Sequence, residues 1–241
     1  MSTSSLPVAV VTGGTSGIGL AVARDLAKDH QVYALGRNKE SLAQLSLRQN
    51  IEAVEIDLLD FAAQRAFIIS LAKINVLVHA AAISEQTTVE NATPDVWQKQ
   101  FSINLFAPAE LTRLALPALR EQHGQIVFIN SGSGTLALPG HTVYSASKFA
   151  LNALAHALRG EESENGVRVA TVSPGPTDTP MNRKSREKAG DLLQNSVNEI
   201  DPLEYSTPES VANAVRLVVS ASEETQITEV NVRPRHDKAK R

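Results

Sequence analysis

Short apolar runs alternate with longer amphipathic stretches along the whole chain. Runs rich in β-branched residues predict seven strands, at residues 8–13, 31–36, 51–57, 75–81, 124–131, 167–175 and 229–234. Several of these runs are almost continuously apolar, which is typical of strands that are buried on both faces of a parallel sheet. The amphipathic stretches predict helices at residues 18–28, 39–47, 60–73, 94–122, 144–164 and 208–220.

The regular alternation of strands and helices predicts an α/β fold with a doubly wound parallel sheet. We interpret residues 1–241 as one domain, because no linker, internal repeat or low-complexity segment interrupts the alternation. Residues 180–206 are polar and irregular. We expect them to form a lid over the carboxyl ends of the strands, where ligands bind in such folds. Residues 233–241 form a basic tail.

The composition narrows the class of protein without indicating a function. The chain is 42% hydrophobic and 20% charged, and its net charge of −3 provides no positive field for nucleic acid. It has no cysteine, so disulfides and thiolate chemistry are excluded and a reducing cytoplasm is the expected location. We expect no membrane contact, because no apolar run reaches the roughly 18 residues of a span. We expect no metal, because the histidines are scattered without metal-ligand spacing.

The first predicted strand runs into the glycine-rich turn TGGTSGIG at residues 12–19. Glycine lets the chain turn tightly and lets backbone N–H groups approach a pyrophosphate, while the next helix points its positive end at the same phosphates. Such a turn alone also fits an ordinary strand–helix connection, but its place at the start of the series favours a dinucleotide site. The residues predicted to hold the cofactor here are Gly13, Thr15, Ser16, Gly17, Ile18 and Gly19.

The end of the second predicted strand bears on the choice of cofactor. Enzymes that use NAD place an acid there, which accepts a hydrogen bond from the ribose 2′-OH, whereas an arginine suits a 2′-phosphate. The sequence at this point is ALGRNKE, with Gly36 and Arg37 and no acid. We therefore expect NADP(H) to be preferred over NAD(H); the alternative is that Arg37 is an ordinary surface arginine.

Three motifs together resemble those of classical short-chain dehydrogenase/reductases. They are TGGTSGIG at residues 12–19, YSASK at residues 144–148 and SPGPTDT at residues 173–179, and the resemblance extends over residues 8–232. It implies a Rossmann-type domain with seven parallel strands, a nicotinamide cofactor and a small-molecule substrate. It also implies a homodimer or homotetramer that pairs through the two longest helices. The implied catalytic set is Asn104, Ser131, Tyr144 and Lys148.

The same resemblance extends the expected cofactor site. It implies that Asp57 lies near the adenine and Thr179 near the nicotinamide amide. Residues next to the matching motifs are also expected to bind the cofactor. The further residues expected to bind the cofactor are Leu58, Ala80, Ala81, Lys148, Pro174, Gly175 and Thr177. The chain departs from the family pattern at residues 79–82, where HAAA replaces NNAG, and at Asn130, which replaces the first of the usual serine pair.

The spacing of Tyr144 and Lys148 suggests how a phenol could exchange a proton with a substrate oxygen. Lowering a tyrosine pKa from about 10 to about 7 requires roughly 4 kcal/mol, and a positive charge ~4 Å away contributes up to ~4 kcal/mol at an effective dielectric constant near 20. Because positions i and i+4 share a helix face, we expect Lys148 to lower the pKa of Tyr144. Ser131 can fix the substrate oxygen. By resemblance, Asn104 holds a water that relays protons to Lys148.

These residues favour an NADP(H)-dependent oxidoreductase that interconverts a carbonyl, in a ketone or aldehyde, and an alcohol. One alternative is a non-catalytic NADP-binding sensor, which would not need the complete set of four catalytic residues. The other is a sugar-nucleotide epimerase or dehydratase of the related extended family. The short chain and the GxxxGxG spacing argue against that reading.

Overall fold

The computed structural model describes residues 6–185 and 203–236. Its strands form one seven-stranded sheet in the order β3-β2-β1-β4-β5-β6-β7, and every neighbouring pair is parallel. The strands are β1 (Val8–Thr12), β2 (Gln31–Gly36), β3 (Ile51–Glu55), β4 (Val76–His79), β5 (Gln125–Ile129), β6 (Arg168–Pro174) and β7 (Glu229–Val232). The predicted α/β domain with a parallel, seven-stranded, Rossmann-type sheet is confirmed.

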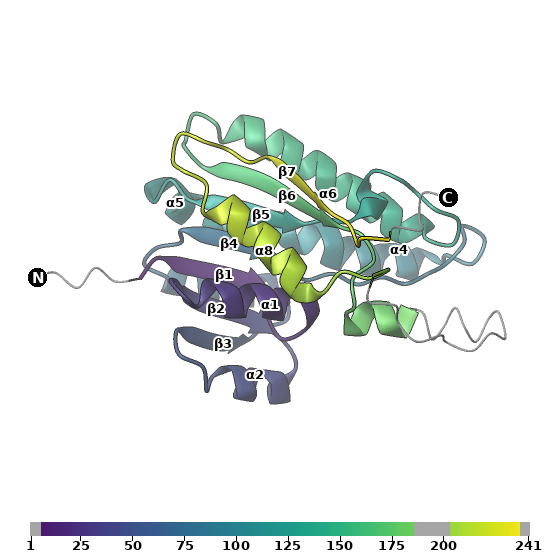
Figure 1. Ribbon diagram of the computed structural model, residues 1–241, viewed down its shortest axis with the longest axis horizontal. Helices are drawn as coiled ribbons and strands as arrows, with labels where there is room; N and C mark the ends of the chain where they lie inside the picture. The colour runs from purple at the N-terminus through teal and green to yellow at the C-terminus, as the bar shows by residue number, and fades with distance from the viewer. Residues whose placement is uncertain (1–5, 186–202, 237–241) are drawn as a thin grey trace, which may run out of the picture.

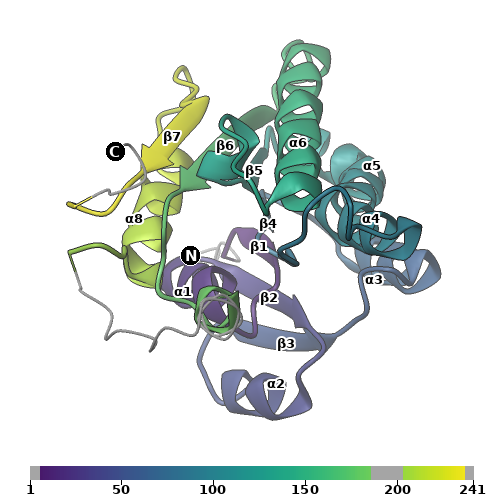
Figure 2. The same cartoon turned by 90° about the vertical axis from the view of Figure 1, so that its right-hand side faces the viewer.

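Helices cover both faces of this sheet (Figures 1 and 2). They are α1 (Gly17–Leu26), α2 (Lys39–Leu45), α3 (Phe61–Ser70), α4 (Pro94–Phe101), α5 (Ala107–Glu121), α6 (Thr142–Glu161) and α8 (Pro208–Val219). One apolar cluster joins α1 and α8 to alternate strand residues such as Ala9 and Val11. The other joins α3, α5 and α6 to the residues between them, such as Val10. This alternation is the expected consequence of side chains pointing to opposite faces along a strand.

The chain order in the sheet reverses between β1 and β4, which are both central (Figure 2). From β1 the sheet grows through β2 and β3 in one direction, and from β4 through β5, β6 and β7 in the other. In open parallel sheets, the carboxyl ends of two such strands leave a crevice in which ligands bind. The site should therefore be sought after Thr12 and His79.

The region that was expected to be one helix at residues 94–122 is divided. A π-helical turn, η1 (Ser102–Phe106), separates α4 from α5. The buried amide of Asn104 lies inside this turn and bonds to other elements, and π-turns inside helices commonly mark such functional positions. The local widening is therefore associated with tertiary contacts of a polar side chain, which helical periodicity does not reveal.

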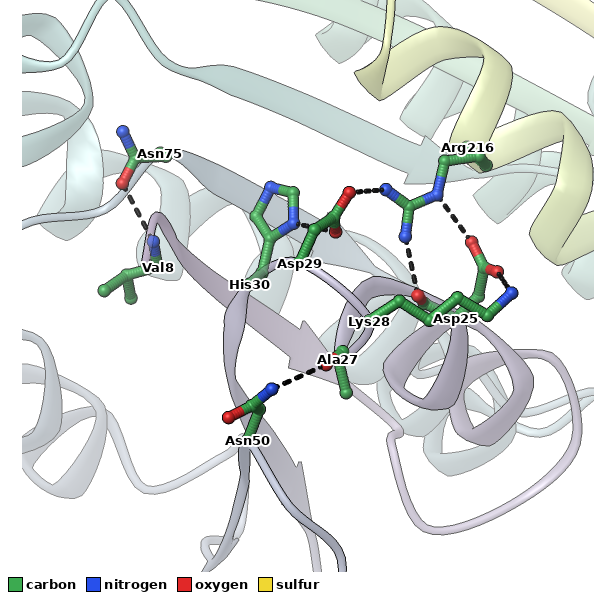
Figure 3. A network of polar contacts seen from close by, with 9 residues as sticks. All are labelled: Val8, Asp25, Ala27, Lys28, Asp29, His30, Asn50, Asn75 and Arg216. Atoms are coloured by element: carbon green, nitrogen blue, oxygen red, sulfur yellow. Dashed lines mark hydrogen bonds and ion pairs between the residues drawn. The ribbon is translucent and has the colours of Figure 1, made fainter. Parts of the chain in front are cut away.

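A charged network joins α8 to the end of α1 at the amino-terminal edge of the sheet (Figure 3). Arg216 Nε lies 2.8 Å from Asp25 Oδ2, its Nη1 lies 2.6 Å from Asp29 Oδ2, and its Nη2 donates to the Asp25 carbonyl oxygen. Burial would raise the pKa of both carboxyl groups. Hydrogen bonds from Lys28 and Arg216 to Asp25, and from Arg216 and His30 to Asp29, outweigh that effect and lower both pKa values.

In the part of the chain that the structure describes, no helix is both long enough and apolar enough to span a lipid bilayer.

Candidate active site

The glycine-rich turn packs too closely for larger residues at several positions, among them Gly13 and Gly19. Gly13 has φ +67°, and a Cβ on it would lie 2.9 Å from the backbone of Ala81. A Cβ on Gly19 would lie 2.3 Å from the carbonyl oxygen of Gly13. The turn after β1 is thus folded against the turn after β4. Ser16 provides no side-chain cap, so the first N–H groups of α1 face the turn without competition from a cap.

A cavity of about 360 Å³ lies at the reversal point of the sheet, and most of the predicted cofactor residues line it. The turn after β1 and the turn after β4 both contribute to its wall, and Tyr144 closes part of it. A ring of backbone donors at the start of a helix, beside an apolar wall, fits a dinucleotide. The predicted residues on its lining are Gly13, Thr15, Ser16, Gly17, Ile18, Gly19, Arg37, Asp57, Leu58, Ala80, Ala81, Lys148 and Thr179.

Three predicted cofactor residues lie outside this lining. Pro174 ends β6, Gly175 N donates to the Val232 carbonyl oxygen at 2.7 Å, and Thr177 pairs with Ser206 in an isolated bridge. They hold the strand end and the chain that leads to Thr179. Thr179 packs near Gly17, where a Cβ would lie 3.3 Å from its Cγ2.

Other residues line the cavity without having been predicted to bind the cofactor. Leu35, Ile56 and Ile129 lie at the carboxyl ends of predicted strands, so the general rule for ligand sites in parallel sheets could have found them. The remaining side chains come from loops and helices whose approach depends on the tertiary fold. These are Asn38, Ala82, Ile83, Ile103, Pro180 and Met181, whereas Gly36 ends β2 and Asn130 directly follows β5.

Arg37 lies at the rim of the cavity after β2. Its side chain is 64% exposed and its Nη1 is 3.5 Å from Asp57 Oδ2, whose side chain is 50% exposed. An exposed pair at this distance is weak, so the guanidinium can turn to another anion. Glycine at position 36 leaves room for the Thr15 side chain, because a Cβ on Gly36 would lie 2.3 Å from Thr15 Cγ2.

Tyr144 and Lys148 lie in the first two turns of α6, and both line the cavity. The Lys148 side chain is buried, and its Nζ donates to the Ile129 carbonyl oxygen at 2.9 Å and lies 5.9 Å from the centroid of the Tyr144 ring. Ser131 caps the short 3-10 helix η2 (Gly132–Gly134) after β5 and hydrogen-bonds to the Tyr144 side chain. The structure therefore brings Ser131, Tyr144 and Lys148 together.

The pKa shifts at this pair differ from the sequence-based expectation. Burial raises the pKa of Tyr144, and the hydrogen bond with Ser131 opposes that rise only in part. Burial also lowers the pKa of Lys148 to about 8. The expected lowering of the Tyr144 pKa by Lys148 is wrong for this arrangement, because desolvation dominates and the ammonium group is directed to a backbone carbonyl.

Asn104 is buried in the π-helical turn and its amide bonds directly to protein groups. Its Oδ1 accepts from Ile83 N at 2.9 Å, and its Nδ2 donates to the Ile83 carbonyl oxygen at 2.9 Å and to Ser147 Oγ at 3.0 Å. Ser147 Oγ in turn donates to the Tyr144 carbonyl oxygen at 2.7 Å. The side chain thus connects the loop after β4 to the helix that carries Tyr144.

Two segments near the site are described only in part. Residues 180–185 of the expected lid are helical, and Arg183 forms a bidentate pair with Asp178, with both contacts at 2.7 Å. Residues 186–202 of the expected lid at 180–206 lie outside the described residues, as do residues 237–241 of the basic tail. Within the tail, Arg233 donates to the Ser173 carbonyl oxygen at 2.7 Å.

A parallel sheet with a glycine-rich first turn, together with a tyrosine and a lysine of one helix in the same cavity, is typical of a dinucleotide-binding oxidoreductase fold. The family model described as short chain dehydrogenase matches residues 7–190, so the chain belongs to the short-chain dehydrogenase/reductase family. The resemblance that the sequence motifs indicated is confirmed.

The individual relatives have modest sequence identity to this chain, and they differ from one another in length. An uncharacterized oxidoreductase of Staphylococcus saprophyticus is 29% identical over 239 residues, which cover 94% of this chain and 97% of that protein. Glycine betaine reductase ATRR of Emericella nidulans is 30% identical over 241 residues, which cover 95% of this chain but only 19% of that protein. A crystal structure of a variant of actinorhodin polyketide ketoreductase with NADPH superposes with a TM-score of 0.89 at 27% identity, covering 97% of this chain and 98% of that one.

Proposed function

We propose that this protein is an NADP(H)-dependent oxidoreductase that interconverts the carbonyl group of a ketone or aldehyde and the corresponding alcohol. The observation that carries the proposal is one cavity whose lining includes both the glycine-rich turn after β1 and the side chains of the half-buried Tyr144 and the buried Lys148. When bound there, the nicotinamide of the cofactor supplies or accepts the hydride. The related ketoreductase structure contains NADPH, which supports the same cofactor class.

Tyr144 and Ser131 would carry out the proton transfer to and from the substrate oxygen. Because burial raises its pKa, Tyr144 carries its proton at neutral pH and can donate it to a carbonyl oxygen that gains negative charge. Ser131, which hydrogen-bonds to the Tyr144 side chain, can hold the same oxygen in place. Alcohol oxidation needs the phenolate instead, so its rate should increase as the pH rises towards the raised pKa of Tyr144.

The glycine-rich turn and the residues around it would bind the cofactor. The N–H groups of the turn from Gly13 to Gly19 would bind the pyrophosphate. Arg37 would bind a 2′-phosphate, because its contact with Asp57 is weak and exposed, and this favours NADP(H) over NAD(H). Asp57 would lie near the adenine, and Lys148 would also hold the ribose of the nicotinamide.

The proposed function is tested with Tyr144→Phe, measured by NADPH oxidation against a panel of ketones, aldehydes and quinones and by NADP reduction with 3-hydroxy acids. General acid catalysis contributes about 10²–10⁴-fold, so turnover should fall by at least about a hundredfold while NADPH still binds in a fluorescence titration. Tyr33→Phe removes the same atom from β2, where Tyr33 packs against Phe67, and serves as the matched control. Turnover by Tyr144→Phe that equals the Tyr33→Phe rate would show that Tyr144 is not the acid.

The assembly and location follow the family. We expect a homodimer or homotetramer that pairs through α5 and α6; Phe106, which directly precedes α5, and Phe149 in α6 are 50% and 44% exposed. Light scattering of the purified protein distinguishes these states from a monomer. The cytoplasmic location, a small-molecule substrate and the absence of nucleic acid among the partners remain parts of the same proposal.

A further inference from the structure

Two buried amide side chains hold one extended segment after β4 in the same manner. Asn104 accepts from the N–H of Ile83 and donates to its carbonyl oxygen, both at 2.9 Å. Gln100 accepts from the N–H of Glu85 at 3.1 Å and donates to its carbonyl oxygen at 3.3 Å. Each amide therefore binds the donor and the acceptor of one residue, as a neighbouring strand would.

The spacing of these four residues explains why the two contacts can coexist. Gln100 and Asn104 are four residues apart, which is about 6 Å along a helix. Ile83 and Glu85 are two residues apart, which is about 6.6 Å in an extended chain. The two repeats nearly match, so the pair of amides sets both the position and the register of the segment.

The segment at residues 83–87 connects the cavity to the start of the catalytic helix. Ile83 lines the cavity. At the other end, Thr87 N donates to the Gly140 carbonyl oxygen at 2.8 Å, and Gln86 Nε2 lies 3.2 Å from His141 Nε2. His141 immediately precedes α6, which carries Tyr144. Any slip of this segment would move one wall of the cavity and the turn before Tyr144 together.

Gln100 is unlike the other two glutamines that are buried to the same degree in the described residues. Gln64 donates to the Leu58 carbonyl oxygen and Gln125 to the Val218 carbonyl oxygen, but the Oε1 atom of each has no hydrogen-bond partner there. Both polar ends of Gln100 are bonded, and both bonds go to one residue of the loop. Because burying an amide is unfavourable unless it is paired, this full pairing points to a specific role.

We propose that Gln100 is a positioning residue, which acts with Asn104 to hold residues 83–85 in register against α4 and so fixes the cavity wall next to the reacting groups. The proposal rests on the proposed function, because the wall that Gln100 positions is the wall of the cofactor and substrate cavity. Gln100 is not among the residues that line the cavity, and its amide bonds to Glu85, so its effect is on binding geometry and not on the proton transfer itself.

The test compares Gln100→Met with Gln125→Met, which makes the same change at an equally buried glutamine away from the site. Amide hydrogen exchange, followed by NMR without cofactor, should accelerate about tenfold at Glu85 in Gln100→Met. Ile83 should stay protected because Asn104 still binds it. The Kd for NADPH and the KM for the carbonyl should rise about tenfold, whereas kcat and its pH profile should change little. Unchanged exchange at Glu85, or a Kd equal to that of Gln125→Met, would overturn the proposal.

The wild-type protein provides a second measurement that does not depend on a variant folding. Exchange should be slow at Ile83, Glu85 and Thr87 and faster at Ser84 and Gln86, for whose N–H groups the described residues provide no acceptor. A uniform rate from residue 83 to residue 87 contradicts the amide pairing. A wild-type protein that shows the alternation but neither binds nor oxidises NADPH overturns the proposed function and not the register.

Discussion

Two of the polar networks in the described residues change the pKa values of their members in opposite ways. In the Arg216 network between α1 and α8, the carboxyl groups of Asp25 and Asp29 have lowered pKa values, so their charged forms are favoured (Figure 3). Around Tyr144 and Lys148, burial raises the pKa of the phenol and lowers that of the ammonium group to about 8, so both neutral forms are favoured. The first network stabilises charged side chains, whereas burial in the second favours uncharged ones.

This difference separates a structural use of ionisable groups from a functional one. Charged partners at hydrogen-bond distance favour the charged forms and stabilise a fold, whereas burial without an opposite charge shifts pKa values against the charged forms, which is common at functional sites. Such a site is expected to reduce the stability of the fold. The two networks should therefore respond oppositely to loss of a cation, with activity lost at one and stability lost at the other.

The largest effect is expected for Lys148→Met. Without the ammonium group, Tyr144 loses the cation that lies 5.9 Å from its ring centroid, and we expect turnover to fall by about a hundredfold or more. The free energy of unfolding should stay the same or increase at pH 7, because a buried cation is replaced by an apolar side chain of similar length. Urea unfolding and steady-state kinetics on one preparation check both halves. A variant that is inactive because it is unfolded would contradict the contrast.

A smaller and more selective effect is expected for Arg37→Ala. If the guanidinium binds a 2′-phosphate, the KM for NADPH should rise about tenfold or more while the KM for NADH changes little. Arg48→Ala removes another exposed arginine, from the loop after α2, and should change neither value. An equal change for both cofactors would remove the proposed role of Arg37.

The strand pattern and the motifs were sufficient to predict the fold and much of the candidate site. Buried parallel strands appear as apolar runs, and a phosphate turn needs glycine where the backbone packs closely, as at Gly13 and Gly19. The clamp by Gln100 could not be predicted, because it depends on which loop lies beside α4 in the fold. The direction of the Tyr144 pKa shift was missed for a related reason. The i, i+4 spacing brings Lys148 to the same helix face but does not specify that Nζ binds the Ile129 carbonyl oxygen.

The smallest effect is expected for Arg216→Met. It should be the opposite of the Lys148→Met effect, because stability is lost while activity is kept. Loss of Arg216 leaves Asp25 and Asp29 without their shared cation, so the free energy of unfolding at pH 7 should fall by about 1–2 kcal/mol, while kcat and the NADPH affinity stay unchanged. Arg113→Met breaks an exposed pair with Glu110 inside α5 and should change stability much less.

The pH dependence of the free energy of unfolding tests whether Arg216 stabilises the fold through its charge. Both carboxyl groups have pKa values below 3.8 in the folded protein, so the stability that Arg216 contributes is present above that pH and is lost as the pH falls through the lowered values. The difference between the urea midpoints of the wild type and Arg216→Met should therefore be full at pH 7 and shrink as the pH falls below 3.8. A constant difference across this range would mean that Arg216 stabilises the α1–α8 contact through packing of its aliphatic stem, and the contrast between a charge-stabilised network and a desolvated one would then hold only for the Tyr144 side.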